Sequence, residues 1–340
     1  MKIDNNILKE YKDNGLLYCS EHPTLPLIIW NYSQKVQYEG LWDDITLECR
    51  GLVTDQVGNI VSRGFSKFFN IEENKHVPTD TFEVFEKLDG QYIAVFWYNG
   101  EMVINSRGSF TSVYVDVARK LLDEKYPHFK TFAEKNLTYC FELIGFEQIV
   151  VSYPEPDVIL TGIFQIGNEQ CLPTVDEPNH YFGCKVVKKF IGLDWKNIKQ
   201  LNWKNSEGFV VRFSNGNRCK IKFEDYIRLH RIMTNISEKK IWQALKDGKP
   251  LTEYLEDVPD EFFNEVREIE DELWDKYSDI ELDSEMIANC LSKSGLTRKQ
   301  IAQDILNRRP KTSSIIFAML DGKDYSKMIW EQLEPPVNNF

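Results

Sequence analysis

The pattern of hydrophobic and polar positions changes near residue 236 of the chain. Before this point short β-type runs prevail, in which apolar residues stand together or alternate with polar ones. After it, apolar residues recur every three or four positions, as they do in helices that bury one face. We therefore predict two domains, an α+β domain over residues 1–236 and an all-helical domain over residues 237–340.

The first domain is expected to consist of antiparallel sheets flanked by helices. Asn99-Gly100 between two β-rich runs predicts a two-residue hairpin turn, and residues 111–126 have helical spacing. On or near one face of this helix stand Val113, Val117, Leu121 and Leu122. The predicted strands span residues 82–87, 91–98, 102–104, 137–143, 158–166, 208–213 and 218–223.

Several helices separated by short breaks are predicted in the second domain. Thr297 stands three residues before Gln300, a spacing typical of a capping box at a helix N-terminus. The run from 251 to 285 contains fifteen acidic residues and only Arg267 and Lys276 as cations, so we expect a solvated helical face there. The predicted helices span residues 237–247, 259–277, 283–292, 297–307, 313–320 and 325–333.

Composition indicates a folded chain of the cytoplasm. Hydrophobic residues make up 42% of the chain, enough for a sizeable core, and no apolar run approaches the length of a membrane span. The N-terminus lacks a signal-peptide pattern. The seven cysteines stand singly and the five histidines are spread apart, which favours a reducing compartment and argues against a zinc site.

Lys87 is the first candidate for chemistry. It ends a predicted strand and precedes Leu88-Asp89-Gly90, so a tight turn exposes its amine at the rim of a sheet. An ordinary surface lysine is the simpler interpretation, because Lys-x-Asp-Gly arises by chance in roughly a few per cent of chains of this length. Further segments change this balance. They are Glu48-Cys49-Arg50-Gly51, Ser66-Lys67-Phe68-Phe69-Asn70, Phe141-Glu142, Glu207-Gly208-Phe209-Val210, Lys220-Ile221-Lys222 and, just after these, Asp225-Tyr226.

In this order and spacing the segments resemble the covalent nucleotidyltransferase superfamily of ligases and capping enzymes, and most of all the T4 RNA ligase 1 family. The likeness covers residues 40–232, and a weaker one continues over residues 288–335. It implies a nucleotidyltransferase (adenylyltransferase) domain followed by a helical domain that selects the substrate. The implied activity is ATP-dependent joining of RNA 5′-phosphate and 3′-hydroxyl ends, with AMP carried first on Lys87 and then on the RNA as AppRNA.

Lys220 and Lys222 fit this chemistry as catalytic partners of Lys87. They stand two positions apart on a predicted strand, so both side chains point to the same face. Two ammonium groups there would favour the neutral form of Lys87, which must attack the α-phosphate, and would neutralise charge as pyrophosphate leaves. The alternative is a pair of solvent-facing lysines on an edge strand.

Glu142 and Glu207 are the acidic candidates, and we assign both to nucleotide and metal binding. Magnesium binds carboxylate oxygens and waters, and ATP chemistry normally requires it. By the resemblance, Glu142 holds ribose hydroxyls or acts on the RNA end, and Glu207 helps to bind Mg²⁺ or Mn²⁺. A strand glutamate facing solvent is the alternative for each. Glu142 lies in an apolar run, where a buried charge is costly unless it is paired.

Further residues are expected to line the nucleotide site. A guanidinium at Arg50 suits a phosphate or a 3′-terminal ribose, and Lys67 with Phe69 supplies a cation for phosphate and a ring for adenine. Arg107 stands where the family leads us to expect a lysine, which keeps the charge and changes the geometry. The resemblance thus adds to the nucleotide site Arg50, Lys67, Phe69, Gly90, Arg107 and Tyr226.

Two other classes of function stay open on the sequence. A DNA ligase or a capping guanylyltransferase shares Lys-x-Asp-Gly, but no oligonucleotide-binding barrel is predicted after Lys222. A non-ligating protein that senses RNA ends would keep the fold without turnover. The partners implied are RNA with 5′-phosphate and 3′-hydroxyl ends, with broken tRNA as one candidate, and enzymes that heal such ends; we expect a monomer. Because the net charge is −12, RNA must bind at a local basic patch.

Overall fold

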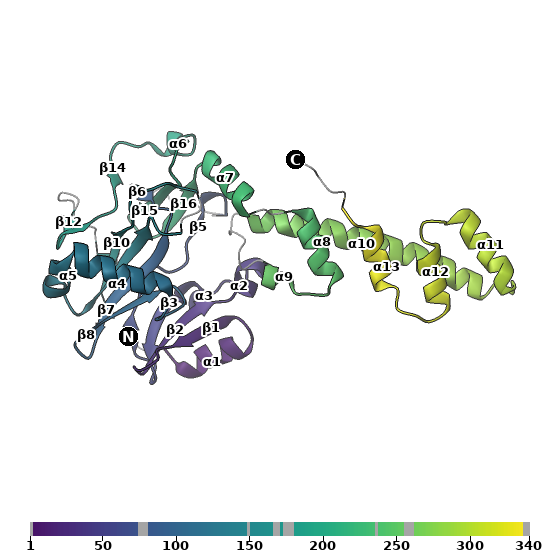
Figure 1. Ribbon diagram of the computed structural model, residues 1–340, viewed down its shortest axis with the longest axis horizontal. Helices are drawn as coiled ribbons and strands as arrows, with labels where there is room; N and C mark the ends of the chain where they lie inside the picture. The colour runs from purple at the N-terminus through teal and green to yellow at the C-terminus, as the bar shows by residue number, and fades with distance from the viewer. Residues whose placement is uncertain are drawn as a thin grey trace. The chain divides into compact units, whose positions relative to one another are not determined.

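The computed structural model describes residues 3–73, 81–147, 150–165, 171–172, 180–234, 237–254 and 262–335. The chain divides into two compact units, Met1–Met233 and Thr234–Phe340, drawn in Figure 1. Residues 235 and 236, where the sequence places the domain boundary, lie outside the described residues. The first unit combines helices with antiparallel sheets and the second is helical, which confirms the predicted fold class.

A four-stranded antiparallel sheet opens the first unit, with strand order β1-β2-β3-β4. Its elements are α1 (Asn5–Asp13), β1 (Leu17–Glu21), β2 (Leu27–Tyr32), α2 (Gln34–Glu39), α3 (Asp44–Glu48), β3 (Arg50–Asp55) and β4 (Ile60–Ser62). Trp30 and Leu52 pack with Leu8 of α1 in a buried cluster. The side chains of Asp4 and Asp43 accept backbone N–H groups at the starts of α1 and α3, which fixes where these helices begin.

A central sheet has the order β11-β10-β9-β7-β8 and is antiparallel throughout. Its elements are β7 (Gln91–Tyr98), β8 (Glu101–Ser106), α4 (Val113–Lys125), α5 (Pro127–Phe132), β9 (Leu137–Ile144), β10 (Asp157–Gln165) and β11 (Cys171–Leu172). The helices α4 and α5 cover one face of this sheet, where Ala118 and Phe129 pack against Tyr139 and Leu160 (Figure 1). Side chains alternate along a strand, so Glu142 and Tyr92 point to the opposite face.

A second five-stranded sheet has the order β14-β6-β15-β16-β5, in which only β5 runs parallel to its neighbour. Its elements, with the short segments around it, are β5 (Phe69–Asn70), the 3₁₀ turn η1 (Ile71–Glu73), β6 (Phe82–Lys87), β12 (His180–Tyr181), β13 (Cys184–Lys185), β14 (Lys189–Phe190), α6 (Trp195–Ile198), β15 (Gly208–Phe213), β16 (Arg218–Lys222) and α7 (Glu224–Thr234). One face buries Val84, Phe209 and Ile221 in a core of its own.

The other face of this second sheet is turned toward the central sheet. Phe85 on β6 and Leu88 after it pack with Ile144 on β9 and Ile159 on β10. These four residues are apolar and buried, so they close part of the space between the two sheets. The charged positions on the same two faces are therefore brought to the rest of that space, where the site described below lies.

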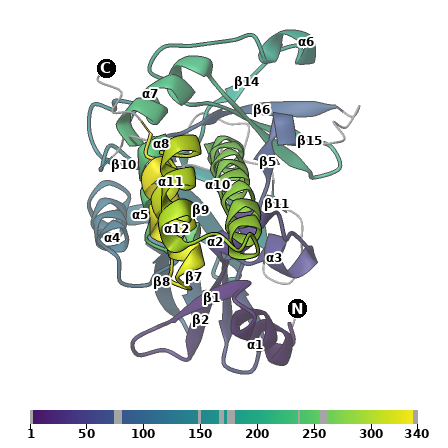
Figure 2. The same cartoon turned by 90° about the vertical axis from the view of Figure 1, so that its right-hand side faces the viewer.

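The second unit is a set of helices around one long helix. The described helices are α8 (Glu238–Lys246), α9 (Leu251–Tyr254), α10 (Phe263–Ser292), α11 (Arg298–Arg308), α12 (Ser313–Leu320) and α13 (Ser326–Gln332). Ala288 and Leu291 of α10 pack with Ile305 of α11 and Ile316 of α12, and Figure 2 shows α11 and α12 beside α10. None of the described helices has the length and apolar character needed to span a bilayer.

Most sequence predictions of elements are confirmed, and that of two separate helices over residues 259–292 is wrong. Residues 259–277 and 283–292 were expected to form two helices, but α10 is continuous over Phe263–Ser292, since no glycine or proline interrupts it; residues 259–261 lie outside the described part. The inward face of α4 carries Val115 and Ala118 rather than Val113, which is 50% exposed. The capping box is confirmed, because the Thr297 N–H donates to the Gln300 side chain.

Candidate active site between two sheets

Lys87 is the last residue of β6, at the rim of the second sheet. It stands in register with Gly208 on β15, and Gly208 in turn stands in register with Lys222 on β16. Lys220 and Lys222 alternate with buried Cys219 and Ile221, so the predicted common face of the two lysines is confirmed. The three predicted catalytic lysines thus lie in one sheet, on the two strands that flank β15.

Glu207 joins two of these lysines. One carboxylate oxygen, Oε1, lies 2.7 Å from the Nζ of Lys87 and 3.5 Å from the Nζ of Lys222. The Glu207 side chain is 4% exposed and that of Lys87 is 19% exposed, so water screens the pair only weakly.

Gly208 permits this close arrangement. Its φ is +149°, and a Cβ atom placed there would lie 2.0 Å from the carbonyl oxygen of Ile221 on the neighbouring strand. Any side chain would therefore push β16 away from β15, and with it Lys222 away from Glu207. The glycine of the Glu-Gly segment is required by the backbone contact between strands.

The turn after Lys87 packs against Glu142. A Cβ atom at Gly90 would lie 2.3 Å from the carbonyl oxygen of Leu143 and 3.0 Å from Cγ of Glu142, so only glycine fits. Burial raises the pKa of Glu142 to about 7, although the positive charges of Lys87 and Arg50 act in the opposite direction. Glu142 is thus an electrostatically perturbed carboxyl group next to the predicted nucleophile, which is typical of functional sites.

Asp89 and Tyr226 support the same turn. One oxygen of Asp89 accepts the N–H groups of Val150 and Val151, and the other accepts the hydroxyl of Tyr226 at 3.1 Å. The Tyr226 ring is buried, and the Nζ of Lys222 lies 5.5 Å from its centroid. These contacts make Asp89 a structural residue; the nucleotide-binding role of Tyr226 stays a prediction.

Lys67 and Phe69 lie in an aromatic environment that the sequence did not reveal. The Nζ of Lys67 is 5.3 to 5.5 Å from the ring centroids of Tyr32, Trp42 and Phe69. Trp42 meets the Phe69 ring edge-to-face at 5.3 Å. The ring of Phe69 is thus already packed on one tryptophan. Its role as a platform for adenine stays a prediction.

Arg50 is the first residue of β3, and Arg107 directly follows β8. The guanidinium of Arg50 lies 5.3 Å from the ring centroid of Tyr92, and that of Arg107 lies 5.7 Å from the ring of Tyr32. A Cβ atom at Gly51 would lie 3.3 Å from the carbonyl oxygen of Arg107, so the two arginine-bearing segments touch. In the sequence, these contacts were indicated only by the presence of aromatic residues in otherwise apolar strands.

An open cavity of about 1020 Å³ continues along the same sheet face, away from Lys87. Its wall includes Arg212 and Arg218, which pair in register four residues along the strands from Gly208 and Lys222. Of the predicted site residues, Lys67 and Phe69 line this cavity, whereas Lys87, Glu142 and Glu207 do not. The predicted site residues are therefore divided between the wall of the cavity and the region outside it.

The two carboxylates are compatible with a bound magnesium ion. Among the residues described, no three His, Cys, Asp or Glu side chains form a metal-binding group. Magnesium commonly uses one or two carboxylates together with waters and phosphate oxygens, so Glu142 and Glu207 are a sufficient set. In the structure the Glu207 oxygen is shared by two lysines, and a metal ion would have to compete with them.

Comparison with known proteins shows the family of this chain. A family model described as RNA ligase matches residues 48–227, more than half of the chain and the span that carries Lys87, Glu142, Glu207 and Lys222. The chain belongs to the T4 RNA ligase 1 family. As a member of this RNA ligase family it is expected to bind nucleotides, and the resemblance predicted from the motifs is confirmed.

Curated relatives carry related names. The chain is 29% identical over 247 residues to a candidate bifunctional polynucleotide kinase/RNA ligase of Autographa californica nuclear polyhedrosis virus, covering 60% of this chain and 35% of the viral protein. It is 23% identical over 380 residues to an RNA ligase of Rhodothermus phage RM378, covering 85% of each chain. This chain thus covers about a third of the length of the viral relative.

Solved structures give weaker likenesses. An RNA ligase of Naegleria gruberi with pyrophosphate has a TM-score of 0.38 and 19% identity, over 45% of this chain and 52% of that chain. A candidate ATP-dependent DNA ligase from Aquifex aeolicus has a TM-score of 0.44 and 16% identity, over 82% of this chain and 80% of that one.

Proposed function

We propose that this chain is an ATP-dependent RNA ligase that joins a 5′-phosphate to a 3′-hydroxyl end. The observation that carries the proposal is the meeting of Lys87 and Lys222 at one oxygen of Glu207, within the span that matches the RNA ligase family. A lysine, a carboxylate acceptor and a second cation are the groups needed to attack a phosphorus atom and to balance the charge that leaves.

In the first step Nζ of Lys87 loses a proton and attacks the α-phosphorus of ATP. The bond from this phosphorus to the oxygen bridging the β-phosphorus breaks, and pyrophosphate leaves as lysyl-AMP forms. Glu207 Oε1, 2.7 Å from Nζ, is the acceptor placed to take the proton. Lys220 and Lys222 then face the leaving phosphates from β16, the second strand along the sheet from Lys87.

The second and third steps use the same pocket. An oxygen of the RNA 5′-phosphate attacks the phosphorus of lysyl-AMP, Lys87 leaves and recovers a proton, and AppRNA is formed. The RNA 3′-hydroxyl then attacks the 5′-phosphorus of AppRNA and expels AMP. Magnesium or manganese, held by Glu142 and Glu207, would supply charge neutralisation at the phosphate oxygens. Sealing of broken tRNA within an RNA repair process is the cellular role we propose.

The first test is the fate of Lys87. Lys87→Ala should abolish formation of the acid-stable protein–AMP adduct from radiolabelled ATP, because no other group takes the place of the amine. Lys120→Ala, an exposed lysine on α4, serves as the matched control and should label normally. An adduct that persists in Lys87→Ala contradicts the assignment.

Substrate choice separates the proposal from its rivals. GTP in excess should fail to compete with ATP for adduct formation if the chain is not a capping enzyme. A panel of broken tRNA, linear RNA and nicked DNA duplexes tests the polynucleotide. Labelling by ATP without sealing of any RNA would favour a protein that senses RNA ends.

A further inference from the structure

Asn31 connects two of the segments that carry predicted phosphate ligands. It is the penultimate residue of β2 and is 1% exposed. Its Oδ1 accepts the N–H of Gly51 at 2.9 Å, and its Nδ2 donates to the carbonyl of Arg107 at 2.8 Å. Both ends of the amide are used, so its orientation is fixed by its partners.

The irregular backbone at Gly51 explains why a side chain is needed there. The register of β2 and β3 shifts between the pairs Trp30–Leu52 and Asn31–Arg50, which leaves Gly51 as an extra residue with a φ of +75°. The N–H group of a bulged residue leaves the regular ladder, and a buried N–H without an acceptor is costly. Asn31 provides that acceptor and so fixes the backbone next to Arg50.

Tyr32, the next residue, has two cations near its ring. The ring is 6% exposed; Lys67 Nζ is 5.5 Å and Arg107 Cζ 5.7 Å from its centroid. Trp42 holds the ring edge-to-face at 4.9 Å. The face of an aromatic ring attracts cations within about 6 Å, so Tyr32 offsets part of the repulsion between the two positive groups.

We infer that Asn31 and Tyr32 are positioning residues that hold Arg50, Lys67 and Arg107, the predicted phosphate ligands, in place before a nucleotide binds; these three cations are called the receptor below. The inference rests on the proposed function. The three cations come from separate segments of the chain, and like charges repel each other unless the fold holds them in place. Cations that are ordered before the ligand arrives cost less entropy on binding.

Asn31 and Tyr32 lie outside residues 48–227, the span matched by the family model. Both lie on β2 of the first sheet, next to β3, which begins with Arg50. Conservative variants separate the two kinds of contact. Asn31→Asp keeps an acceptor for Gly51 but loses the donor to Arg107, whereas Tyr32→Phe keeps the ring.

The decisive experiment compares two reactions of the full chain. Formation of lysyl-AMP requires the ATP triphosphate, whereas sealing of RNA that is already adenylylated does not. In Asn31→Asp and Tyr32→Leu we expect the KM for ATP in lysyl-AMP formation to rise about tenfold, the equivalent of one lost buried hydrogen bond. The rate at saturating ATP and the sealing of pre-adenylylated RNA should change little.

Two variants serve as controls. Tyr32→Phe should restore a KM near that of the unmodified chain, because the aromatic face is retained. Asn59→Ala removes an exposed turn amide that donates to Asp55, and it should leave both reactions unchanged. An unchanged KM in Asn31→Asp overturns the inference. A parallel loss of both reactions together with a lower melting temperature also overturns it, since Asn31 is then structural only.

Failure of the proposed function would be recognised separately. If the unmodified chain forms no lysyl-AMP, the receptor is measured by calorimetric titration with inorganic pyrophosphate. Binding about tenfold weaker in Asn31→Asp than in the unmodified chain supports the inference. Equal affinities, or no pyrophosphate binding by the unmodified chain, overturn it.

Discussion

Two acidic residues on neighbouring strands of the central sheet meet opposite environments. Glu142 lies on β9 beside the turn of Lys87, and Asp157 begins β10, opposite Ile144 in the strand register. Burial raises the pKa of Glu142 to about 7. Burial would also raise the pKa of Asp157, but hydrogen bonds outweigh it and hold that pKa below its usual value.

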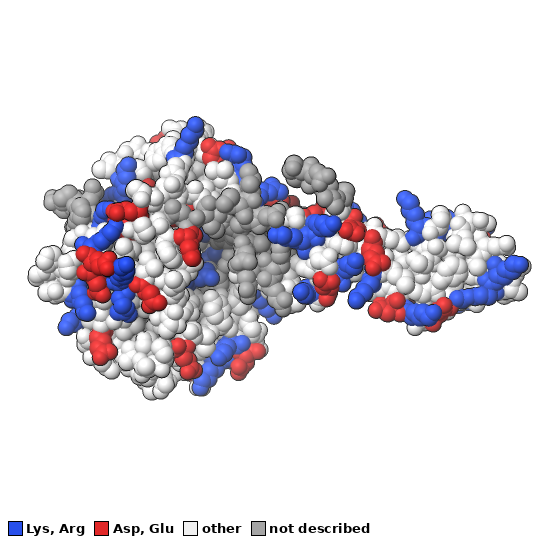
Figure 3. Space-filling view, viewed as in Figure 1, with Lys and Arg blue, Asp and Glu red and all other residues white. Residues whose placement is uncertain are grey.

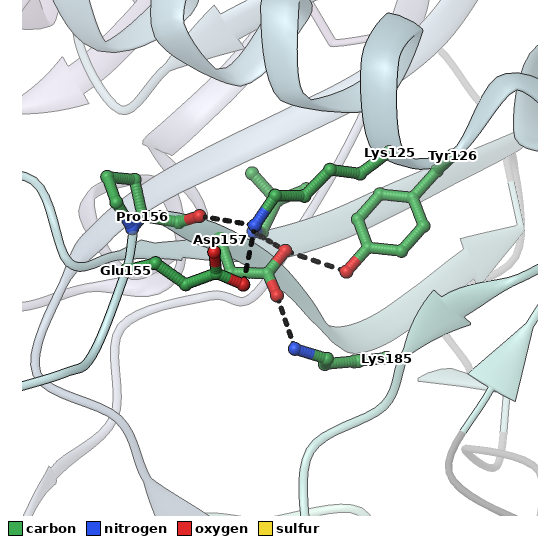
Figure 4. Close-up of polar contacts among 7 residues, drawn as sticks. Lys125, Tyr126, Glu155, Pro156, Asp157 and Lys185 are labelled. Atoms are coloured by element: carbon green, nitrogen blue, oxygen red, sulfur yellow. Dashed lines mark hydrogen bonds and ion pairs between the residues drawn. The ribbon is translucent and has the colours of Figure 1, made fainter.

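The difference lies in the donors that surround each carboxylate. Asp157 accepts the hydroxyl of Tyr126 at 2.7 Å and the N–H of Val158 at 2.9 Å through Oδ1, and Lys185 Nζ at 2.7 Å through Oδ2, as Figure 4 shows for the side-chain contacts. None of the residues that the structure describes donates a hydrogen bond to the carboxylate of Glu142. A supporting carboxylate is satisfied by the fold, whereas a site carboxylate keeps its acceptors for a ligand.

Asp157 belongs to a polar junction between helix and sheet. Lys125, next to Tyr126 at the end of α4, donates to the Glu155 carboxylate at 3.0 Å and to the Pro156 carbonyl at 2.9 Å (Figure 4). The junction joins α4, which covers the central sheet, to the start of β10. The comparison therefore predicts that changes at Glu142 affect catalysis, while changes at Asp157 affect stability.

Glu142→Gln is expected to have the largest effect. The amide keeps the shape and removes the charge, so lysyl-AMP formation should fall by about 10² or more, the usual cost of losing a group that acts in the transition state. Initial rates with radiolabelled ATP measure this. Glu101→Gln, at an exposed strand start, is the control and should keep full activity.

The stability of Glu142→Gln also tests the prediction that Glu142 serves catalysis and not the stability of the fold. Folding raises the pKa of the Glu142 carboxyl group from 4.5 to about 7. The unfolded chain therefore releases this proton at a lower pH than the folded chain, and the fold loses stability as the pH rises from 4.5 to above 7. The variant should thus be at least as stable as the unmodified chain at pH 8 in thermal melting. A clear loss of stability would place Glu142 among the structural residues.

Asp157→Asn is the converse change and should lower stability by about 2 kcal/mol, because buried donors of Tyr126 and Val158 lose a charged acceptor. Lys185 is half exposed, so its ion pair adds only a part of this. Chemical denaturation measures the loss, with Asp116→Asn on the exposed face of α4 as control. Lysyl-AMP formation by the folded variant should stay within about twofold. Strongly reduced activity at full stability would contradict the comparison.

The elements that carry the site could be predicted because their signals are local. Strands Phe82–Lys87, Gln91–Tyr98 and Gly208–Phe213 coincide with the predicted ranges, since alternation and turn residues such as Asn99-Gly100 define their ends. Asn99 and Gly100 both have positive φ, as a two-residue hairpin requires. Lys87 could be found because its partners stand in a recognisable order along the chain.

The tertiary contacts of the site could not be predicted, because they join distant positions. Asn31 contacts residues 20 and 76 positions away, and nothing near it in the sequence marks either partner. Only its place in the apolar strand Leu27–Tyr32 gave a signal, a polar residue where burial is expected. The ion pair of Glu207 with Lys87 was missed as well, since both had been assigned to ATP and metal.

The proposed binding of RNA requires a surface whose charge the sequence also leaves open. On the face shown in Figure 3, lysines and arginines are interspersed with aspartates and glutamates. The predicted local basic patch therefore stays a prediction, as does recognition by the helical unit. The acidic run lies largely on α10, where most of its described members are exposed, in agreement with a solvated face.

Lys185→Met is expected to give the smallest effect and to sharpen the comparison through its pH dependence. The ion pair with Asp157 is 2.7 Å long but half exposed on the lysine side, so its loss should cost about 0.5–1 kcal/mol near pH 7. The pKa of Asp157 is lowered in the fold, so this contribution is present above the unfolded value near 3.8 and disappears as the pH falls through the folded value. Denaturation curves should thus differ at pH 7 and converge as the pH falls through the lowered pKa of Asp157 in the folded chain. Lys135→Met, an exposed lysine, is the control. A difference that persists in acid would mean that the methylene chain of Lys185, and not its charge, supports the junction.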